Sequence, residues 1–230
     1  VAKLPEPLGK SFLSSVKPVL DQIGESVGQF LRIKGAGVAK KALGEAVQAI
    51  DKVHGISGLP VIPVESTRSK AFQGAYSYMA SSGDAVRIRI SSESRNPGLT
   101  ALHEIGHFID HQSLNGRKGY ASTSDPLLEK FRQAVDRSAA TAELEAELAK
   151  TGISAVRKTC RYYLETHEQW ARAYAQYVAT RSGNAALVGQ LDAIRNSAHA
   201  VYRNSQWSDA DFAPIGDSID ELLMALGFKQ

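Results

Sequence analysis

The 230-residue sequence predicts a mostly helical α+β fold with one small sheet, and three observations support this prediction. Apolar residues recur every three or four positions along most of the chain, as they do in amphipathic helices. One short stretch, AVRIRIS at residues 85–91, alternates apolar and basic residues in the manner of a half-buried strand. Hydrophobic residues make up 43% and charged residues 22% of the chain, which is typical of a globular protein rather than a disordered or membrane protein.

The composition also narrows the classes of partner. The 27 basic and 24 acidic residues are spread along the chain and give a formal charge of +3, so we expect no nucleic-acid partner. No apolar run approaches the roughly 20 residues that span a bilayer and no signal peptide is found, so we expect no membrane partner. The single cysteine, Cys160, excludes an internal disulfide framework. Because the sequence begins with Val1, we expect it to be a piece of a longer polypeptide.

Two helices and a connection are expected before the alternating strand. Residues 11–31 form an amphipathic pattern that tolerates Pro18 at a kink, and residues 38–53 form a second helical pattern. Two glycines and two prolines interrupt residues 54–66. We therefore expect a connection there that can include a short edge strand.

The strand at residues 85–91 is followed by a turn and then by the helix that matters most for function, over residues 98–112. The remaining elements follow in order: a polar, glycine-rich loop at 113–126, helices at 126–150, 156–180 and 184–203, a turn capped by Asp209 or Asp211, and a last helix at 217–226. The sequence contains no internal repeat.

The helix expected at residues 98–112 carries the pattern His-Glu-x-x-His. His103 and His107 are four residues apart, so their side chains lie on nearly the same helix face, about 5 to 6 Å from each other. Two imidazoles at that separation can bind one zinc ion, at Zn–N distances of about 2.0 to 2.1 Å. Glu104 lies on the flank of this face, where it can deprotonate a metal-bound water without being a ligand. The pattern is typical of zinc hydrolases.

Two nearby positions do not supply the third ligand that a catalytic zinc needs. His111 continues the four-residue series, but it stands about 12 Å from His103 along the helix axis. One ion cannot easily bridge that distance, so we expect His111 behind the ligands or at the surface. The metzincin pattern requires a histidine ten residues after the first one, and Ser113 stands there, which excludes that class.

The better third ligand lies in the stretch YYLETHEQWARAYAQYV at residues 162–178. Its apolar residues mark one side of a helix as buried, and Glu168 stands beside that side. A carboxylate that faces a packed interior is costly unless it meets a cation, and a metal ion supplies one. Glu165, one turn earlier, is a rival ligand, whereas His167 points about 100° away from Glu168 and is expected at the surface.

The two motifs together resemble a known group of enzymes. HEIGHFID, followed 61 residues after His107 by EQWARAY, is similar to gluzincins of the anthrax lethal factor type and to zincin domains of phage-encoded and mobile-element polyvalent proteins. The resemblance covers residues 70–228 and implies a zincin-like metalloprotease fold, with a C-terminal helical subdomain. It also implies zinc bound by His103, His107 and Glu168, with Glu104 as general base.

The resemblance extends to further positions and departs at one. In such enzymes a tyrosine shortly before the ligand glutamate stabilises the oxyanion, which points to Tyr162 or Tyr163, with Tyr162 slightly favoured by spacing. A place in the core or rim at the start of a helix is an equally good interpretation of both. Asp110 can orient a ligand histidine or simply contact the helix end. Thermolysin-like gluzincins carry an aspartate where this chain has Arg172, so the surroundings of the site are expected to differ.

The motif and the resemblance imply a zinc-dependent endopeptidase that hydrolyses a protein or peptide substrate by attack of a metal-activated water. We expect residues 61–230 to form the catalytic domain and residues 1–60 an N-terminal helical segment that packs on it or precedes it. The strand at residues 85–91 would be an edge strand that pairs with an extended substrate. Three alternatives remain: a catalytically silent zincin-fold module of a phage or toxin protein, a non-peptide amide hydrolase with Cys160 as a ligand, and a helical interaction protein without metal.

Overall fold

The computed structural model describes residues 24–34, 37–114 and 119–229. Its first part contains η1 (Val27–Phe30), β1 (Leu31–Lys34), α2 (Val38–Val53), β2 (Ile62–Thr67), β3 (Gly74–Tyr78), β4 (Ala85–Ser91) and α3 (Pro97–Gln112). Its second part is helical, with α4 (Ala121–Ser124), η2 (Pro126–Leu128), α5 (Glu129–Asp136), α6 (Ala139–Lys150), α7 (Ser154–Leu164), α8 (Thr166–Ser182), α9 (Ala185–Arg195), α10 (Ala200–Arg203) and α11 (Asp209–Ala225). The predicted α+β fold, mostly helical with a small sheet and a helical C-terminal part, is confirmed.

The four strands form one mixed sheet in the order β1-β2-β4-β3. The strands β1, β2 and β4 run parallel, and β3 pairs antiparallel with β4 at one end of the sheet. The inward side chains of the two middle strands are buried in the core with α2 and α3; they are Ile62, Val64, Ile88 and Ile90. This apolar face explains why the parallel strands, joined by crossover connections, are stable with helices on one side.

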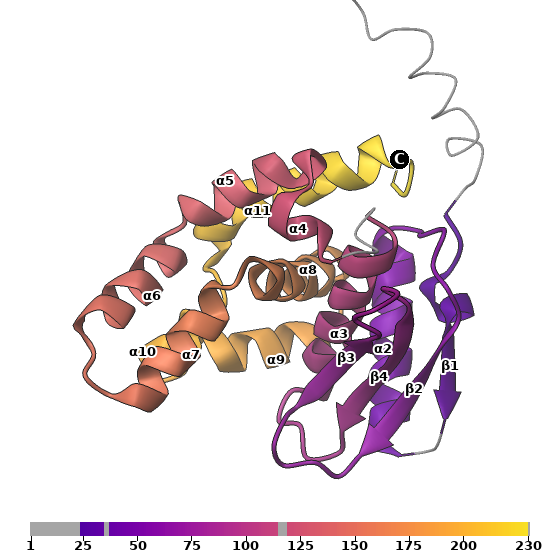
Figure 1. The fold of residues 1–230 in the computed structure, drawn as a ribbon, viewed down its shortest axis with the longest axis horizontal. Helices are drawn as coiled ribbons and strands as arrows, with labels where there is room; N and C mark the ends of the chain where they lie inside the picture. Colours follow the sequence, from indigo (N-terminus) through magenta and orange to yellow (C-terminus); the bar gives the residue numbers. More distant parts are fainter. Residues whose placement is uncertain (1–23, 35–36, 115–118, 230) are drawn as a thin grey trace, which may run out of the picture.

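The helices α3 and α8 pack against each other at the centre of the molecule, between the sheet with α2 and the remaining helices (Figure 1). Gly106 permits this contact, because a Cβ atom there would lie 3.0 Å from Cδ1 of Tyr174 and 3.3 Å from Cα of Ala171. The indole nitrogen of Trp170 donates a hydrogen bond of 3.1 Å to the carbonyl oxygen of Gly106. The positions of the two helices are therefore fixed relative to each other at the level of the histidines.

The first part of the chain differs from its expected elements in three ways. Of the helix expected over residues 11–31, residues 11–23 lie outside the described residues, and the rest forms η1 and the start of β1. The strand β2 was expected at an edge but lies between β1 and β4, and β4 is also internal. The edge near α3 is β3, which the sequence pattern did not predict. Alternation indicates a strand, but the neighbours of that strand depend on tertiary pairing.

The long helical patterns of the second part are divided by local capping. The pattern at 126–150 breaks at Ser138, whose hydroxyl accepts a hydrogen bond of 3.3 Å from the backbone N–H of Thr141 and so starts α6. The pattern at 156–180 breaks at Glu165, which is extended at φ −65° and ψ 128°. The last helix is longer than expected, because Ser208 caps it and Pro214 is accommodated within it.

The division of the chain at residue 60 stays a prediction, since residues 1–23 lie outside the described residues. Strand β1 and helix α2, which precede residue 60, pair with β2 and pack on α3, which follow it. Among the described residues, none of the helices combines the length and the apolar character that crossing a bilayer requires.

Candidate metal centre

Helix α3 is held by hydrogen bonds at its first turn and at its middle, and these contacts fix the positions of His103 and His107. Its first turn begins with Pro97, a residue favoured at that position because its missing N–H would be unpaired there. The next two N–H groups, of Gly98 and Leu99, donate to the side-chain oxygen of Gln190 at 3.0 and 3.1 Å. Trp170 of α8 then fixes the middle of the helix through Gly106.

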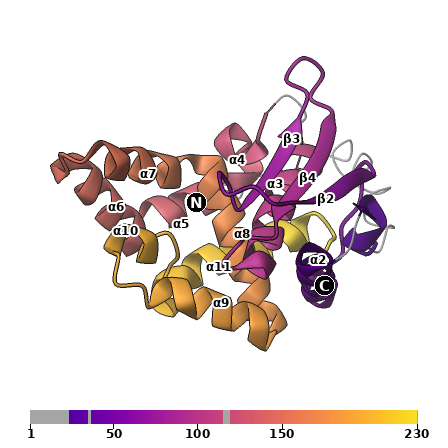
Figure 2. The ribbon, with the colours of Figure 1, turned by 90° about the horizontal axis from the view of Figure 1, so that it is seen from below.

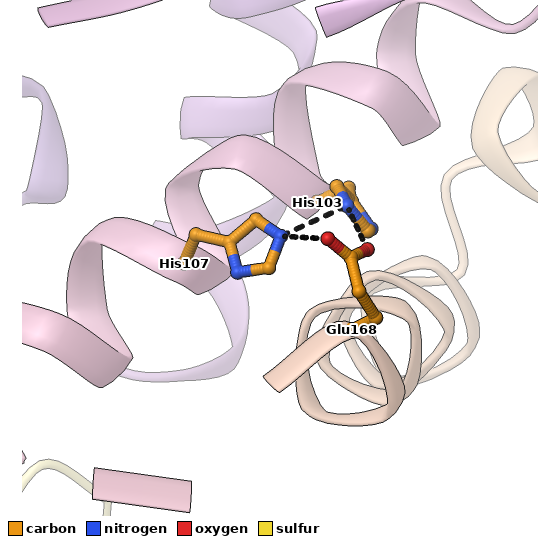
Figure 3. Close-up of side chains that lie close together, drawn as sticks. All are labelled: His103, His107 and Glu168. Carbon is orange, nitrogen blue, oxygen red and sulfur yellow. Dashed lines mark hydrogen bonds and ion pairs between the residues drawn. The ribbon is translucent and has the colours of Figure 1, made fainter. Parts of the chain in front are cut away.

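The side chains of His103, His107 and Glu168 converge on one point between α3 and α8 (Figure 3). The two Nε2 atoms lie 3.1 Å apart. Oε2 of Glu168 lies 3.2 Å from Nε2 of His103, and Oε1 lies 3.4 Å from Nε2 of His107. Glu168 and His107 are buried and His103 is only partly exposed. In the described part of the chain, this is the group of histidine, cysteine and acidic residues that could hold a metal ion.

The separations of these atoms fit a metal ion. Ligand atoms about 2.0 to 2.1 Å from a tetrahedral zinc lie about 3.3 Å from one another. The two Nε2 atoms are 3.1 Å apart and each lies 3.2 or 3.4 Å from its nearer carboxylate oxygen, and one ligand atom from each of the three residues lies within 4.8 Å of the others. Oε2 of Glu168 is buried and faces Nε2 of His103, itself a candidate ligand, and burying a carboxylate is costly unless a cation compensates it. Two imidazoles and a carboxylate form a donor set that zinc commonly takes.

The charge state of Glu168 agrees with a ligand role. Burial alone would raise the pKa of this carboxyl, but hydrogen bonds from His103 and His107, together with their charges, hold its pKa well below the usual range. The first turn of α8 also places Glu168 near the positive end of the helix dipole. Glu168 is therefore ionised at neutral pH beside the two imidazoles, and a cation bound by their Nε2 atoms would compensate its charge in place of their protons.

Glu104 lies beside the group without belonging to it. Its carboxylate accepts a hydrogen bond of 2.7 Å from the backbone N–H of Tyr76 in β3. Gly74 leaves room for the side chain, because a Cβ atom there would lie 2.6 Å from Oε1 of Glu104. Burial raises the pKa of Glu104 to about 7, despite the opposing charge of His107. A carboxyl group with a pKa near neutrality can both accept and donate a proton.

The contribution of β3 was missed by the sequence analysis. The stretch GAYSY at residues 74–78 alternates small residues with tyrosines, which is a strand signal, but it is short. The hydroxyl of Tyr76 lies 2.8 Å from Nδ1 of His111, so the side chain of Tyr76 is anchored on α3 one turn beyond the candidate ligands. The same residue thus joins the edge strand to Glu104 through its backbone and to His111 through its side chain.

The two candidate tyrosines occupy different positions. Burial raises the pKa of Tyr162, and so do the charge of Glu168, a hydrogen bond to it and the charge of Glu104, which places the Tyr162 hydroxyl beside both carboxylates. Tyr163 instead packs against Arg172, whose guanidinium carbon lies 5.0 Å from the ring centre. Of the two, Tyr162 is therefore the one coupled to both Glu168 and Glu104, and its side chain is 43% exposed at the end of α7.

Arg172 explains how the chain differs from the thermolysin pattern. Its buried guanidinium donates to the carbonyl oxygens of Tyr163, Glu168 and Ser205, the last at 2.6 Å and that of Glu168 at 3.1 Å. These bonds tie together the end of α7, the start of α8 and the segment before α11. Arg172 therefore stabilises the bend that aims Glu168 at the histidines.

The rival third ligands lie near the group but outside it. His167 was expected at the surface, but it is half-buried, with its ring stacked on Tyr120 at 4.5 Å and 5.6 Å from the ring of His107. That expectation was wrong, because the bend at Glu165 turns the start of α8 toward α3. The side chain of Glu165 is 52% exposed and lies 3.5 Å from His167.

Three other residues singled out in the sequence have local roles. His111 is buried and packs against Tyr78, with ring centres 4.1 Å apart. Both oxygens of Asp110 accept hydrogen bonds from Ser122, at 2.6 and 2.7 Å, and burial raises its pKa to about 6. Cys160 is buried on α7, where burial and the charge of Glu147 in α6 raise its pKa. Cys160 is not part of the candidate metal group.

Comparisons with protein-family models, with curated proteins and with solved structures find no significant match to this chain. What can be said of function therefore rests on the residues and on the geometry of His103, His107 and Glu168.

Proposed function

We propose that the protein is a zinc-dependent peptidase. The observation that carries the proposal is the convergence of His103, His107 and Glu168, whose ligand atoms lie within 4.8 Å of one another, beside the buried carboxyl group of Glu104. Zinc at this position would lower the pKa of a water molecule toward about 7 and polarise a substrate carbonyl. The gluzincin resemblance of the two motifs supports the same reaction class.

The residues around the group suit hydrolysis of an amide bond. Glu104 takes a proton from the attacking water as the new C–O bond forms, and it returns the proton to the leaving nitrogen as the C–N bond breaks. The backbone N–H of Tyr76 holds the carboxylate of Glu104 at the side of the group. Tyr162 can donate a hydrogen bond to the oxygen on which negative charge develops.

The test measures zinc content and hydrolysis together in four proteins. By elemental mass spectrometry we expect about one zinc per chain in the wild type and none in Glu168→Ala, because two histidines alone hold zinc weakly. Glu104→Gln should keep its zinc but hydrolyse an unfolded protein substrate about 10² to 10⁴ times more slowly. Glu165→Gln, which removes the exposed carboxylate nearby, serves as the matched control and should change neither quantity.

The outcomes separate the competing classes. Zinc without hydrolysis of any peptide would favour the catalytically silent binding module. Normal hydrolysis by Glu104→Gln would contradict the mechanism, and a wild type that takes up no zinc would contradict the proposal as a whole. The phage or mobile-element setting stays a prediction of the resemblance.

A further inference from the structure

Strand β3 has one backbone edge that no other strand of the described residues covers, and the candidate general base Glu104 contacts it at Tyr76. Within the described part of the chain β3 is the last strand of the sheet and pairs with β4 alone. The N–H of Tyr76 points away from β4, because it donates to Glu104 on α3. Backbone groups alternate in direction along a strand, so Gly74 and Tyr76 face the free edge, whereas Ala75 and Ser77 face β4. Figure 2 shows β3 beside α3 at this side of the sheet.

The outer face of the sheet, opposite α2 and α3, is charged rather than apolar. Along β4, the outward residues are Arg87 and Arg89, which alternate with the buried Ile88 and Ile90. In the register of the sheet, Arg89 stands directly opposite Ala75 and Arg87 opposite Ser77. The two edge-strand residues are small, so they leave the space above β3 open to the arginine side chains.

The two arginines differ in what they contact. Arg87 leans toward β2, where its guanidinium lies 3.6 Å from Glu65, and Glu65 also lies 4.0 Å from Lys34. Arg89 leans the other way, with its guanidinium carbon 4.8 Å from the ring centre of Phe72, just before β3. Within the described ranges, no carboxylate lies within ion-pair distance of Arg89. Glu65 stands beside Arg89 in the register of β2 and β4, but its carboxylate is paired with Arg87 and Lys34, so Arg89 has no ion pair in the described part of the chain.

We propose that Arg89 recognises an acidic side chain of an extended peptide that pairs with the outer edge of β3, so that peptides carrying acidic residues are the preferred substrates. This inference rests on the proposed peptidase function and names its substrate class. A peptide strand added to β3 would lie about 10 Å from β4, because neighbouring strands are about 4.8 Å apart. An arginine and a glutamate side chain together span that distance above Ala75.

Recognition by Arg89 has a geometric signature. Side chains of an extended peptide alternate between the two faces, so only every second residue of the substrate can reach Arg89. A general attraction between a basic surface and an acidic peptide would favour acidic residues at all positions. A preference for acidic residues at every second substrate position would therefore indicate recognition by Arg89, whereas a preference at all positions would indicate general charge attraction.

The first experiment maps the bonds cleaved in a mixed peptide library by the zinc-loaded wild type. We expect aspartate and glutamate to be enriched at alternate positions around the cleaved bond. Arg89→Gln should lower kcat/KM for an acidic substrate about tenfold relative to a Gln-containing version of it. Arg87→Gln is the matched control, because Arg87 lies on the same face of the same strand but contacts Glu65, and it should retain the preference.

The second experiment measures binding without turnover. In zinc-loaded Glu104→Gln, a labelled octapeptide alternating Glu and Ala should bind about tenfold more tightly than its Gln and Ala counterpart, and Arg89→Gln should remove the difference. Equal binding of the two peptides, or a preference unchanged by Arg89→Gln, would overturn the inference. Cleavage of neutral peptides with no acidic preference would refute the inference alone, whereas zinc-loaded protein that cleaves nothing would refute the proposed function.

Discussion

Glu104 and Asp110 are both buried carboxyl groups on α3, and their neighbours give them different properties. Glu104 has one backbone donor, Tyr76, and faces the candidate metal group. Asp110 has two donors from Ser122, at the start of α4, and holds that short helix against α3. Asp110 therefore serves the structure of the segment that follows α3 rather than the orientation of His107.

The raised pKa of Asp110 predicts a pH-dependent stability. Burial raises its pKa from 3.8 to about 6, so the folded state holds the proton over a range in which the unfolded state has lost it. The free energy of unfolding should therefore fall as the pH rises from about 4 to about 6, by roughly 1 to 3 kcal/mol from this group. Asp110→Asn lacks this titration and should gain stability relative to the wild type over the same window.

Urea unfolding of both proteins between pH 4 and pH 7, with a chelator present to exclude metal effects, measures the difference. A difference between wild type and Asp110→Asn that stays constant over this pH range would contradict the assignment. The hydrogen bonds from Ser122 oppose the effect of burial, because they stabilise the ionised carboxylate of Asp110 and so make the rise in its pKa smaller.

At the residue scale, the sequence predicts the three clustered side chains, which are candidate ligands, better than their surroundings. The spacing of His103 and His107 on a helix decides their common face, and the apolar residues around Glu168 show that its carboxylate must be buried. The contact of Glu104 with Tyr76 depends on the position of β3 along α3, which no local pattern contains. That is why Tyr76 was missed.

At the scale of elements, Gly106 decides how closely α3 and α8 approach. In Gly106→Ala the new methyl group would lie 3.0 Å from Tyr174 and 3.3 Å from the backbone of Ala171, so α8 must move outward. We expect a loss of about 1 to 3 kcal/mol in the free energy of unfolding and weaker zinc binding, because Glu168 moves with α8.

The control for this substitution is Gly189→Ala in the exposed part of α9, where a Cβ atom would meet nothing within 4 Å. There the gain in helix propensity should stabilise the protein by roughly 0.5 to 1 kcal/mol. Equal effects of the two substitutions on stability and on zinc affinity, measured by denaturant unfolding and by competition with a zinc indicator, would refute the role given to Gly106.

A second element-scale prediction concerns β3. In Gly74→Ala the new Cβ atom would lie 2.6 Å from Oε1 of Glu104 and 2.6 Å from Cγ2 of Thr100. The flexible carboxylate should give way, so we expect kcat to fall at least about tenfold while the zinc content stays near one per chain. Ser77→Ala, on the outward-facing side of the same strand, should leave kcat unchanged. Loss of zinc from Gly74→Ala would show instead that β3 supports the ligands.

The division of the helices could be predicted only in part. The capping residues Ser138 and Ser208 are visible in the sequence, but an apolar pattern that continues across them is also compatible with one longer helix. The bend at Glu165 carries no glycine or proline signal. It is held by Arg172, whose partners include Ser205, 33 residues further along the chain. Only the tertiary structure reveals that contact.

At the scale of the whole molecule, the candidate metal centre joins its two parts. Two candidate ligands belong to α3, which packs on the sheet, and the third belongs to α8, which packs on the helices of the second part (Figure 1). The sequence predicted this fold class because the helical and strand periodicities are strong. It did not predict the order of the strands, because β1, β2 and β4 lie far apart in the chain and no local sequence pattern shows which of them pair.

Because its ligands come from two helices, zinc should stabilise the folded protein as a whole. Free zinc at about 100 times its Kd adds about 2.7 kcal/mol to the free energy of unfolding when the unfolded chain binds none. For a chain of this length that corresponds to a rise in Tm of about 5 to 10 °C over the chelator-treated protein. Magnesium, which prefers oxygen ligands, should not reproduce the shift.

Scanning calorimetry of the wild type and of Glu168→Ala, each with chelator and with zinc, measures this coupling. The variant retains His103 and His107 on α3 but has lost the ligand from α8, so its Tm should respond little to zinc. An equal shift in both proteins would mean that zinc binds elsewhere or through the histidines alone. In that case α3 and α8 are held together by Gly106, Trp170 and their apolar contacts, without a contribution from the metal.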